Sequence, residues 1–395
     1  MNDNYFAAIV VGKGLMAVSA ARYLAEKLDR VALIGPGEPA DFASHDGVYS
    51  SHYDSGRITR VLDPQLVWAQ LALNSIEAYA NIEARSGIQF YYPSGCLTAG
   101  PAGDSRMGDT IAVGHALNRK FAVVTGEEMR QMYPALQFPL EFTGIDERHP
   151  AGHVDPRAFV AASLAVGQQD GLTYVDAIVD AVTPGRPVIV TTRDGQTFTA
   201  DTVIVAAGAY CNPMLPEKLH FTMAPRTVVM ARVSGAEAER VATIPSLIGR
   251  VAPGSTELDG FYSVPVMLYP DGQRYFKIGG SMADLVDTTS FEEVNHWFRT
   301  GGSEREAAAL REVLNNIIVD FQPDGYEAKP CVINHTASGF PYVDEIAEGV
   351  IITSGGHGSA AKSANEIGHL GALLALGEAW PAEFSRDTFK AVFAA

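Results

Sequence analysis

The feature that most constrains the fold of this chain is a glycine turn near its N-terminus. Residues 7–11 are small or β-branched and apolar, which predicts a buried parallel strand. The strand ends in the G-x-G-x-x-A turn Gly12-Lys13-Gly14-Leu15-Met16-Ala17, and a helical pattern follows to about Leu28. Residues 31–34 supply the next apolar strand. A glycine turn between a strand and a helix is typical of dinucleotide binding, and we predict that function for this segment.

Each small residue of the turn has an expected task. Gly12 permits the tight turn, Gly14 lets the backbone approach a pyrophosphate, and Ala17 keeps the helix close to the strand. The acid that usually binds the ribose is missing, because the second strand ends in Gly-Pro-Gly and the first acid is Glu38. Either Glu38 bends back, or backbone and water hold the ribose. Lys13 either faces the phosphates or is solvated.

The composition narrows the classes of partner and compartment. The chain has 395 residues and a formal net charge of −17, which argues against binding to nucleic acid or to an anionic membrane surface. No basic segment precedes the first apolar run, and no run reaches transmembrane length, so we expect no signal peptide and no membrane association. Cys96, Cys211 and Cys331 show neither metal-ligand spacing nor a disulfide framework. We therefore expect a cytoplasmic protein without a metal site.

Apolar strands return to the first strand from distant parts of the sequence. Residues 188–199 predict a hairpin, and residues 202–207 and 350–353 are apolar runs followed by glycine. This order predicts an α/β fold in which a Rossmann-like cofactor-binding domain is interleaved with a mostly antiparallel β-sheet substrate domain. We assign residues 1–86, 147–215 and 328–395 to the cofactor-binding domain, and residues 87–146 and 216–327 to the substrate domain.

A polar segment after the second strand carries a family resemblance. Residues 51–60 read Ser-His-Tyr-Asp-Ser-Gly-Arg-Ile-Thr-Arg. This segment resembles the S-H-x-G-x-x-R-x-x-R segment of FAD-dependent amine oxidases of the monomeric sarcosine oxidase and N-methyltryptophan oxidase type. Later segments match the same family in the same order: residues 276–279 (Phe-Lys-Ile-Gly), 328–331 (Ala-Lys-Pro-Cys), 339–344 (Gly-Phe-Pro-Tyr-Val-Asp) and 358–362 (Gly-Ser-Ala-Ala-Lys).

The resemblance implies roles for particular residues. FAD would be the cofactor, bound covalently through Cys331, and Lys277 would lie over the flavin and promote its reaction with O2. Arg60 and Lys362 would clamp the carboxylate of an amino acid substrate, and Tyr262 would line the substrate pocket. Taken singly, these residues also have ordinary alternatives as surface cations, a snorkelling lysine, a buried thiol or a core aromatic.

The cofactor site draws on the glycine turn and on the resemblance together. Arg57 faces the cofactor or forms a structural ion pair, and His52 hydrogen-bonds the cofactor or is solvated. His357 stands where the family has a small polar residue, so it receives no general-base role. The predicted cofactor-binding residues are Gly12, Gly14, Leu15, Met16, Ala17, Ser51, His52, Arg57, Ile58, Val179, Ala207, Gly208, Cys331, Gly358, Ser359, Ala361 and Lys362.

These implications predict an FAD-dependent oxidase of a secondary or cyclic amino acid. Hydride would pass from the carbon beside the nitrogen to flavin N5 to give an imine, and O2 would reoxidise the flavin to give hydrogen peroxide. Tyr53, Ser281, Ala361 and Ser363 depart from the family's usual residues, so we expect an amine that differs from sarcosine. A dehydrogenase with another electron acceptor and a non-catalytic flavoprotein subunit stay open as alternatives. We expect a monomer or a small homo-oligomer.

Overall fold

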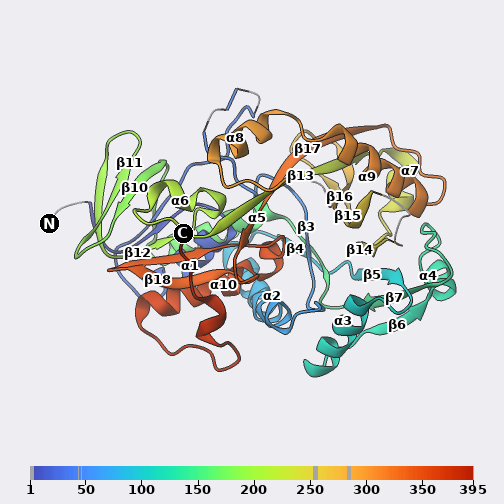
Figure 1. The fold of residues 1–395 in the computed structure, drawn as a ribbon, viewed down its shortest axis with the longest axis horizontal. Coiled ribbons are helices and arrows are strands. Elements are labelled where there is room, and N and C mark those ends of the chain that lie inside the picture. The colour runs from blue at the N-terminus through green and yellow to red at the C-terminus, as the bar shows by residue number, and fades with distance from the viewer. Residues whose placement is uncertain (1–3, 43, 46, 252–256, 283–285, 395) are drawn as a thin grey trace.

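A computed structural model describes residues 4–42, 44, 45, 47–251, 257–282 and 286–394. The chain forms two lobes that lie side by side, and the two termini belong to the same lobe (Figure 1). Each lobe is built on its own large sheet, and a small third sheet lies where the chain passes between them.

The first lobe is built on a sheet whose central strands are parallel. Its strands are β1 (Tyr5–Val11), β2 (Val31–Ile34), β9 (Thr173–Val175), β10 (Val179–Thr183), β11 (Val188–Thr192), β12 (Thr197–Val205), β18 (Tyr342–Ala347) and β19 (Val350–Ser354). Strand β12 pairs in parallel with β1 and with β19, and β2 and β9 continue the sheet beyond β1. The predicted return of distant apolar strands to one sheet is confirmed.

Four helices pack together beside this sheet and share one apolar core with it. They are α1 (Leu15–Ala25), α2 (Leu66–Ser86), α5 (Pro156–Gln169) and α10 (Ala360–Leu376). Helices α1 and α10 approach closely because residue 368 of α10 is glycine, where a Cβ would lie 2.6 Å from the Met16 carbonyl oxygen. This close packing holds the N-terminal ends of α1 and α10 in one region of the lobe, although the helices are far apart in sequence.

The second lobe is built on an eight-stranded, mostly antiparallel sheet in the order β17-β13-β16-β15-β14-β5-β7-β6. Its strands are β5 (Cys96–Pro101), β6 (Ala122–Thr125), β7 (Phe142–Glu147), β13 (Phe221–Arg232), β14 (Ser246–Arg250), β15 (Leu258–Leu268), β16 (Arg274–Met282) and β17 (Gly325–Thr336). Its helices are α3 (Ser105–Ala116), α4 (Gly126–Met132), α7 (Gly235–Val241) and α9 (Glu304–Ile317). Helix α8 (Phe291–Arg299) precedes α9, and its buried Val294 joins an apolar core of the first lobe. Buried leucines of α9 join the core of the second lobe, so that helix covers its sheet.

The third sheet places the polar segment of residues 51–60 between the lobes. It consists of β3 (Arg57–Thr59), β8 (Gly152–Val154) and β4 (Tyr91–Tyr92). The middle strand β8 pairs antiparallel with both of its neighbours. Because β3 pairs with β8 along its length, the backbone from Arg57 to Thr59 is held in a fixed register just before Arg60.

Several local details differ from, or go beyond, the sequence prediction. The hairpin of β11 and β12 is confirmed, but its second arm and the following buried run form one continuous strand because no turn residue interrupts them. The helix predicted after the glycine turn is confirmed as α1, which ends at Ala25 and not at about Leu28. The division into domains stays a prediction, and β17 runs across its boundary at residue 328 while pairing with β13. Among the described residues, none of the helices combines the length and the apolar character that crossing a bilayer requires.

Candidate active site

A cavity of about 1380 Å³ extends from the glycine turn of the first lobe to the sheet of the second lobe. Its walls come from the turn after β1, the loop after β12, residues 48–60, strands β13, β15 and β17, and the segment before α10. Segments that are hundreds of residues apart in the sequence therefore line one cavity. A cavity of this size, between two lobes, is large enough for a cofactor together with a small substrate.

The glycine turn has the shape of a phosphate-binding cradle. Gly12 has a φ of +116°, and a Cβ there would lie 2.5 Å from the Ala206 carbonyl oxygen, so only glycine fits. Gly14 caps α1 without a side-chain hydrogen bond, and the first turn of α1 holds no acid. The N–H groups at the start of α1 are therefore suited to bind an anion. Ala17 is fully buried behind the turn, where its small side chain lets α1 pack in the core of the lobe.

The residues considered for the ribose end of the site are already bonded to protein groups. Glu38 lines the cavity and pairs with Arg157, with 2.6 Å between its Oε1 and Nη2 of Arg157. Lys13 is not fully solvated, because its ammonium donates to the Tyr174 hydroxyl at 2.9 Å and its pKa is lowered by burial. Glu38 thus reaches the cavity as an arginine-paired carboxylate, and Lys13 faces it as a half-buried cation.

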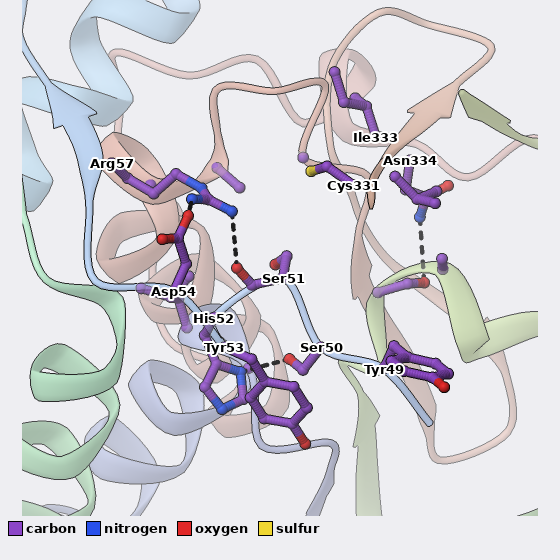
Figure 2. A pocket seen from close by; sticks show the side chains of 18 of the residues that line it. Tyr49, Ser50, Ser51, His52, Tyr53, Asp54, Arg57, Cys331, Ile333 and Asn334 are labelled. Atoms are coloured by element: carbon purple, nitrogen blue, oxygen red, sulfur yellow. Dashed lines mark hydrogen bonds and ion pairs between the residues drawn. The ribbon is translucent and has the colours of Figure 1, made fainter. Parts of the chain in front are cut away.

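His52 is a buried, neutral residue of the cavity wall. Its exposed fraction is 4%, and its Nδ1 is hydrogen-bonded to the hydroxyl of Ser50, as Figure 2 shows. Burial, followed by the charges of Lys13 and Arg157, lowers the pKa of His52 to about 3. The expectation that this histidine is solvated is wrong, because the loop that carries it is packed between the lobes.

Arg57 forms the structural ion pair that the sequence left open, and it also lines the cavity. Its guanidinium forms an ion pair with Asp54 and donates through Nη2 to the Ser51 carbonyl oxygen at 3.0 Å. Figure 2 shows this side chain lying beside Asp54 and Ser51, with Cys331 on a separate strand across the cavity. Arg57 is therefore held in place by a structural ion pair while it lines the cavity.

Asp54 is the partner of several groups, including the predicted oxygen-site lysine. It accepts hydrogen bonds from Lys277 Nζ at 2.6 Å and from the Tyr269 hydroxyl at 2.7 Å, besides its ion pair with Arg57. Lys277 of β16 is fully buried, also donates to the Gly56 carbonyl oxygen, and does not itself line the cavity. Burial and the nearby Arg57 charge hold the pKa of Lys277 well below its ordinary value.

Arg60 and Lys362 meet in one wall of the cavity, as the resemblance implied. Both contact the same carboxylate oxygen of Asp63, Arg60 through Nη2 at 3.2 Å and Lys362 through Nζ at 3.0 Å. Burial alone would raise the pKa of Asp63, but the Lys362 and Arg60 charges hold it well below its usual value. Burial lowers the pKa of Lys362 to about 8, against the attraction of Asp63. Two cations thus face the cavity with one acid behind them.

A buried glutamate fixes the backbone that carries Arg60. The two carboxylate oxygens of Glu147, in β7, accept the N–H groups of Val61 and Leu62, each at 3.0 Å. Glu147 is 2% exposed, and its pKa is raised by burial although these two hydrogen bonds oppose the rise. The second lobe therefore sets the position of the arginine that the first lobe presents to the cavity.

Cys331 and Tyr262 line the cavity from two strands of the second lobe. Cys331 lies in β17, is partly exposed, and its carbonyl oxygen accepts a hydrogen bond from the Trp297 indole at 3.0 Å. Tyr262 lies in β15 and packs against Gly279, where a Cβ would be 2.6 Å from the tyrosine ring. Burial raises the pKa of Tyr262 to about 12, so its hydroxyl is protonated.

His357 lines the cavity, but both of its ring nitrogens are engaged. Its Nε2 accepts the Thr336 N–H at 2.9 Å, and its Nδ1 lies 3.0 Å from Nδ1 of His335. Burial, followed by the charge of His335, lowers the pKa of His357 to about 4. This agrees with leaving His357 without a general-base role, because neither nitrogen is available to a substrate.

Residues 7–374 match the family described as FAD dependent oxidoreductase, DAO. The chain belongs to the DAO family.

Relatives of this DAO family member match part of the chain. A probable sarcosine oxidase from Arabidopsis thaliana is 27% identical over 220 residues, which are 54% of this chain and 51% of that protein. A monomeric sarcosine oxidase from Bacillus sp. (strain B-0618) is 24% identical over 218 residues, which are 54% of each protein. The chain therefore spans about half the length of the curated relatives it matches.

The fold comparison extends over the whole chain. NikD, described as an unusual amino acid oxidase essential for nikkomycin biosynthesis, superposes with a TM-score of 0.77 over 99% of this chain and 98% of its own, at 19% identity. At this identity the likeness shows the fold. The predicted α/β fold, with an FAD-binding domain interleaved with a β-rich domain, is confirmed.

The cavity fits the cofactor of the DAO family. The space that a Cβ at Gly12 would fill, the uncapped start of α1 and the length of the cavity suit an extended dinucleotide such as FAD. All predicted site residues line this cavity except Ala17, which lies behind the turn, and Lys277, which lies behind Asp54.

Three acids of the site were missed by the sequence analysis: Asp54, Asp63 and Glu147. A signal was available for Asp54, because it stands at the glycine position of the S-H-x-G-x-x-R-x-x-R pattern. Asp63 follows Arg60 at a spacing of three residues, which is too common to single out. Glu147 has no local signal, since its partners are 85 and 86 residues away in the sequence.

Proposed function

We propose that this DAO family member is an FAD-dependent oxidase of secondary or cyclic amino acids. The observation that carries the proposal is the meeting of Arg60 and Lys362 in the wall of a cavity that also contains the glycine turn. A cofactor that accepts hydride and a pair of cations for a carboxylate are the two requirements of amino acid oxidation. Sarcosine oxidases among the relatives support this choice of substrate class.

The residues that would hold FAD come from both lobes. The glycine turn and the start of α1 would bind the pyrophosphate, while Ser51, His52 and Arg57 would line the flavin end with Cys331. When bound, FAD would supply an acceptor for the hydride on the carbon beside the substrate nitrogen and a route for both electrons to O2, so that the products would be an imine, which water hydrolyses, and hydrogen peroxide. The N-terminus of α10 would favour the negative charge of the reduced flavin.

Arg60 and Lys362 would hold the carboxylate of the substrate. The guanidinium offers a planar pair of N–H donors, and the ammonium adds a compact charge beside it. Asp63 bonds to both cations from behind and so restrains their side chains before a substrate arrives. This preorganisation lowers the entropy that substrate binding has to overcome.

Lys277 and Cys331 have roles that follow from the resemblance. A buried cation near the cavity lowers the energy of the negative charge that develops when O2 accepts the first electron. The partly exposed thiol of Cys331 faces the cavity, as covalent attachment of FAD requires.

No protein base is required when the amine enters uncharged, which agrees with the engaged nitrogens of His357. Three free cysteines agree with a reducing compartment such as the cytoplasm.

The test is anaerobic mixing of the purified yellow protein with N-methyl, cyclic and glycated amino acids. We expect the flavin absorbance near 450 nm to bleach with at least one of these classes, and one hydrogen peroxide to form per substrate oxidised when air is admitted. Bleaching without peroxide would assign the electrons to an acceptor other than O2. A flavin that no amine reduces would contradict the proposal and favour a non-catalytic subunit.

Covalent attachment is tested separately by acid precipitation. We expect a yellow pellet from the wild type, and a colourless pellet with a yellow supernatant from Cys331→Ser. The matched control is Cys211→Ser, which removes a fully buried thiol of the first lobe and leaves Cys331 in place. A colourless wild-type pellet would rule out the covalent bond.

A further inference from the structure

Asp54 departs from the pattern of its own segment. The S-H-x-G-x-x-R-x-x-R pattern has glycine at this position, and this chain has a carboxylate. The side chain is 14% exposed and lines the cavity, whereas Lys277 behind it is fully buried. An acid in the wall of a site that holds an anionic cofactor is unfavourable unless it serves a partner.

The contacts of Asp54 identify that partner. One carboxylate oxygen accepts from Lys277 Nζ at 2.6 Å, the other from the Tyr269 hydroxyl at 2.7 Å, and Arg57 pairs with it from the cavity side. The Gly56 carbonyl oxygen is a further acceptor for Lys277, but it carries no full charge. Among the salt bridges of the described residues, Asp54 is the acid that contacts Lys277.

The surroundings of Lys277 otherwise oppose its ammonium form. Burial removes the hydration of the charge, and the cations of neighbouring elements repel it. The titratable and charged groups around Lys277 and its carboxylate partner are Asp54 before β3, Arg57 of β3, His153 of β8, Arg157 of α5, Tyr269 after β15, and Lys329 and Cys331 of β17.

We propose that Asp54 is a positioning residue that keeps Lys277 in its ammonium form beneath the cavity, and that the oxygen reaction depends on Asp54 for this reason. The inference rests on the proposed function, because it assumes that Lys277 assists the reaction with O2. With Asp54 present, the buried ion pair holds the proton on Lys277 at neutral pH. Without that charge, Lys277 releases its proton and remains as a neutral amine bonded to the Gly56 carbonyl oxygen.

The substitution Asp54→Asn separates charge from shape. The amide oxygen still accepts a hydrogen bond from Lys277, but the negative charge is gone. The matched control is Asp201→Asn, which removes a carboxylate that likewise accepts from a tyrosine hydroxyl at 2.7 Å, but at an exposed site of the first lobe. Lys277→Met marks the behaviour of a site without the cation.

The first measurement reads the ionisation of Lys277 directly and does not depend on turnover. The chain has eight lysines, so ¹³Cε-lysine labelling of the holoprotein gives few NMR signals, and Lys277→Met assigns the relevant one. We expect the Lys277 signal to be that of an ammonium at neutral pH in the wild type and in Asp201→Asn, and to lose its proton at a higher pH in these two proteins than in Asp54→Asn. In Asp54→Asn we expect it to be that of a neutral amine at pH 8 and to titrate toward the ammonium as the pH falls.

The second measurement follows the reaction of the reduced protein with O2 by stopped flow. At pH 8 we expect Asp54→Asn to react about 10²-fold more slowly than the wild type, as Lys277→Met does, and to regain rate at lower pH. Asp54→Asn and Lys277→Met combined should be no slower than Lys277→Met alone, because both remove the same cation.

The outcomes distinguish this inference from the proposed function. A Lys277 signal that stays an ammonium in Asp54→Asn, or that is already neutral in the wild type, would overturn the inference whatever the enzyme oxidises. A slower oxygen reaction in Asp54→Asn that does not recover at low pH would also overturn it, because a merely structural defect has that signature. A flavin that no amine reduces would instead refute the proposed function, and the NMR result would still decide the role of Asp54.

Discussion

Two buried acid–lysine pairs lie on the cavity in opposite orientations. In the pair of Asp63 and Lys362, with 3.0 Å between carboxylate and ammonium, the lysine faces the cavity and the acid lies behind it. In the pair of Asp54 and Lys277, with 2.6 Å between the same groups, the acid faces the cavity and the lysine lies behind it. The first ion pair thus presents the Lys362 ammonium to a ligand in the cavity. The second keeps the Lys277 ammonium behind the cavity wall, and we call it the hidden pair.

The comparison predicts that the two pairs affect different halves of the reaction. A cation that faces the cavity can bind a carboxylate directly, so its loss should weaken substrate binding. A cation behind the wall acts only through its field, so its loss should leave substrate binding intact and slow the step in which charge develops. Substitutions in each pair therefore test this distinction.

The largest effect is expected at Arg60, the second cation that contacts Asp63 beside the facing pair, which is the pair of Asp63 and Lys362. Arg60→Gln should lower kcat/KM for an amino acid substrate between 10²- and 10³-fold, mostly through KM, because it leaves the substrate carboxylate and Asp63 with one cation between them. Steady-state kinetics at saturating O2 measure this. Arg186→Gln, at an exposed arginine, is the control. An unchanged KM in Arg60→Gln would remove the facing pair from substrate binding.

The next effect is expected at the hidden pair. Lys277→Met should lower turnover with O2 about 10²-fold, because the developing negative charge loses its nearby cation. Turnover with a dye as electron acceptor should stay within about twofold of the wild type, since dye reduction needs no such cation. Comparison of peroxide formation and dye reduction at the same substrate concentration measures the difference. Equal losses with both acceptors would refute the assignment of Lys277.

The facing pair should also confer a pH dependence on anion binding. The pKa of Lys362 is lowered by burial to about 8, below its ordinary value of 10.5. Below pH 8 the ammonium is present and binds carboxylates, and above pH 8 it is lost, so the Kd of acetate should rise toward tenfold per pH unit above about pH 8. Flavin absorbance titrations with acetate from pH 6.5 to 9.5 measure this. The rise should disappear in Lys362→Met, and a flat profile in the wild type would contradict the prediction.

The smallest effect is expected at Tyr262, which belongs to neither pair. Tyr262→Phe keeps the ring that packs against Gly279 and removes the hydroxyl. Because one neutral hydrogen bond is at stake, kcat/KM should fall only about threefold. A fall in kcat/KM as large as that of Arg60→Gln would show that the Tyr262 hydroxyl is as important for the reaction as the charged residues. Thermal unfolding of Tyr262→Phe, expected to match the wild type, checks that packing is intact.

The fold was largely predictable because its signals are local. The apolar run before Gly12, the glycine turn and the helix after it lie within one short stretch, and the structure places them as predicted. The single strand β12 was predicted as two pieces, since nothing in residues 197–205 marks how far a strand continues. The ends of a strand depend on the strands that pair with it, and those partners come from distant segments of the sequence.

The candidate site was predictable where a family pattern supplied the residues, and not where tertiary assembly did. Arg60 and Lys362 were named from their motifs, but their shared acid Asp63 was not, because 299 residues separate it from Lys362. Asp54 and Lys277 are 223 residues apart, and only the folded chain shows that the acid lies between the lysine and the cavity. Ion pairs between distant segments leave no characteristic spacing in the sequence.

The central claim is that the cations beside Asp63 bind the substrate and that the cation behind Asp54 assists the reaction with O2. Rapid mixing of Arg60→Gln and Lys277→Met tests this claim most directly. Anaerobic mixing with substrate measures flavin reduction, and mixing of the reduced protein with O2 measures its reoxidation. The account predicts that Arg60→Gln slows only the first reaction at a given substrate concentration, and that Lys277→Met slows only the second. Equal losses of both reactions in both variants would contradict it.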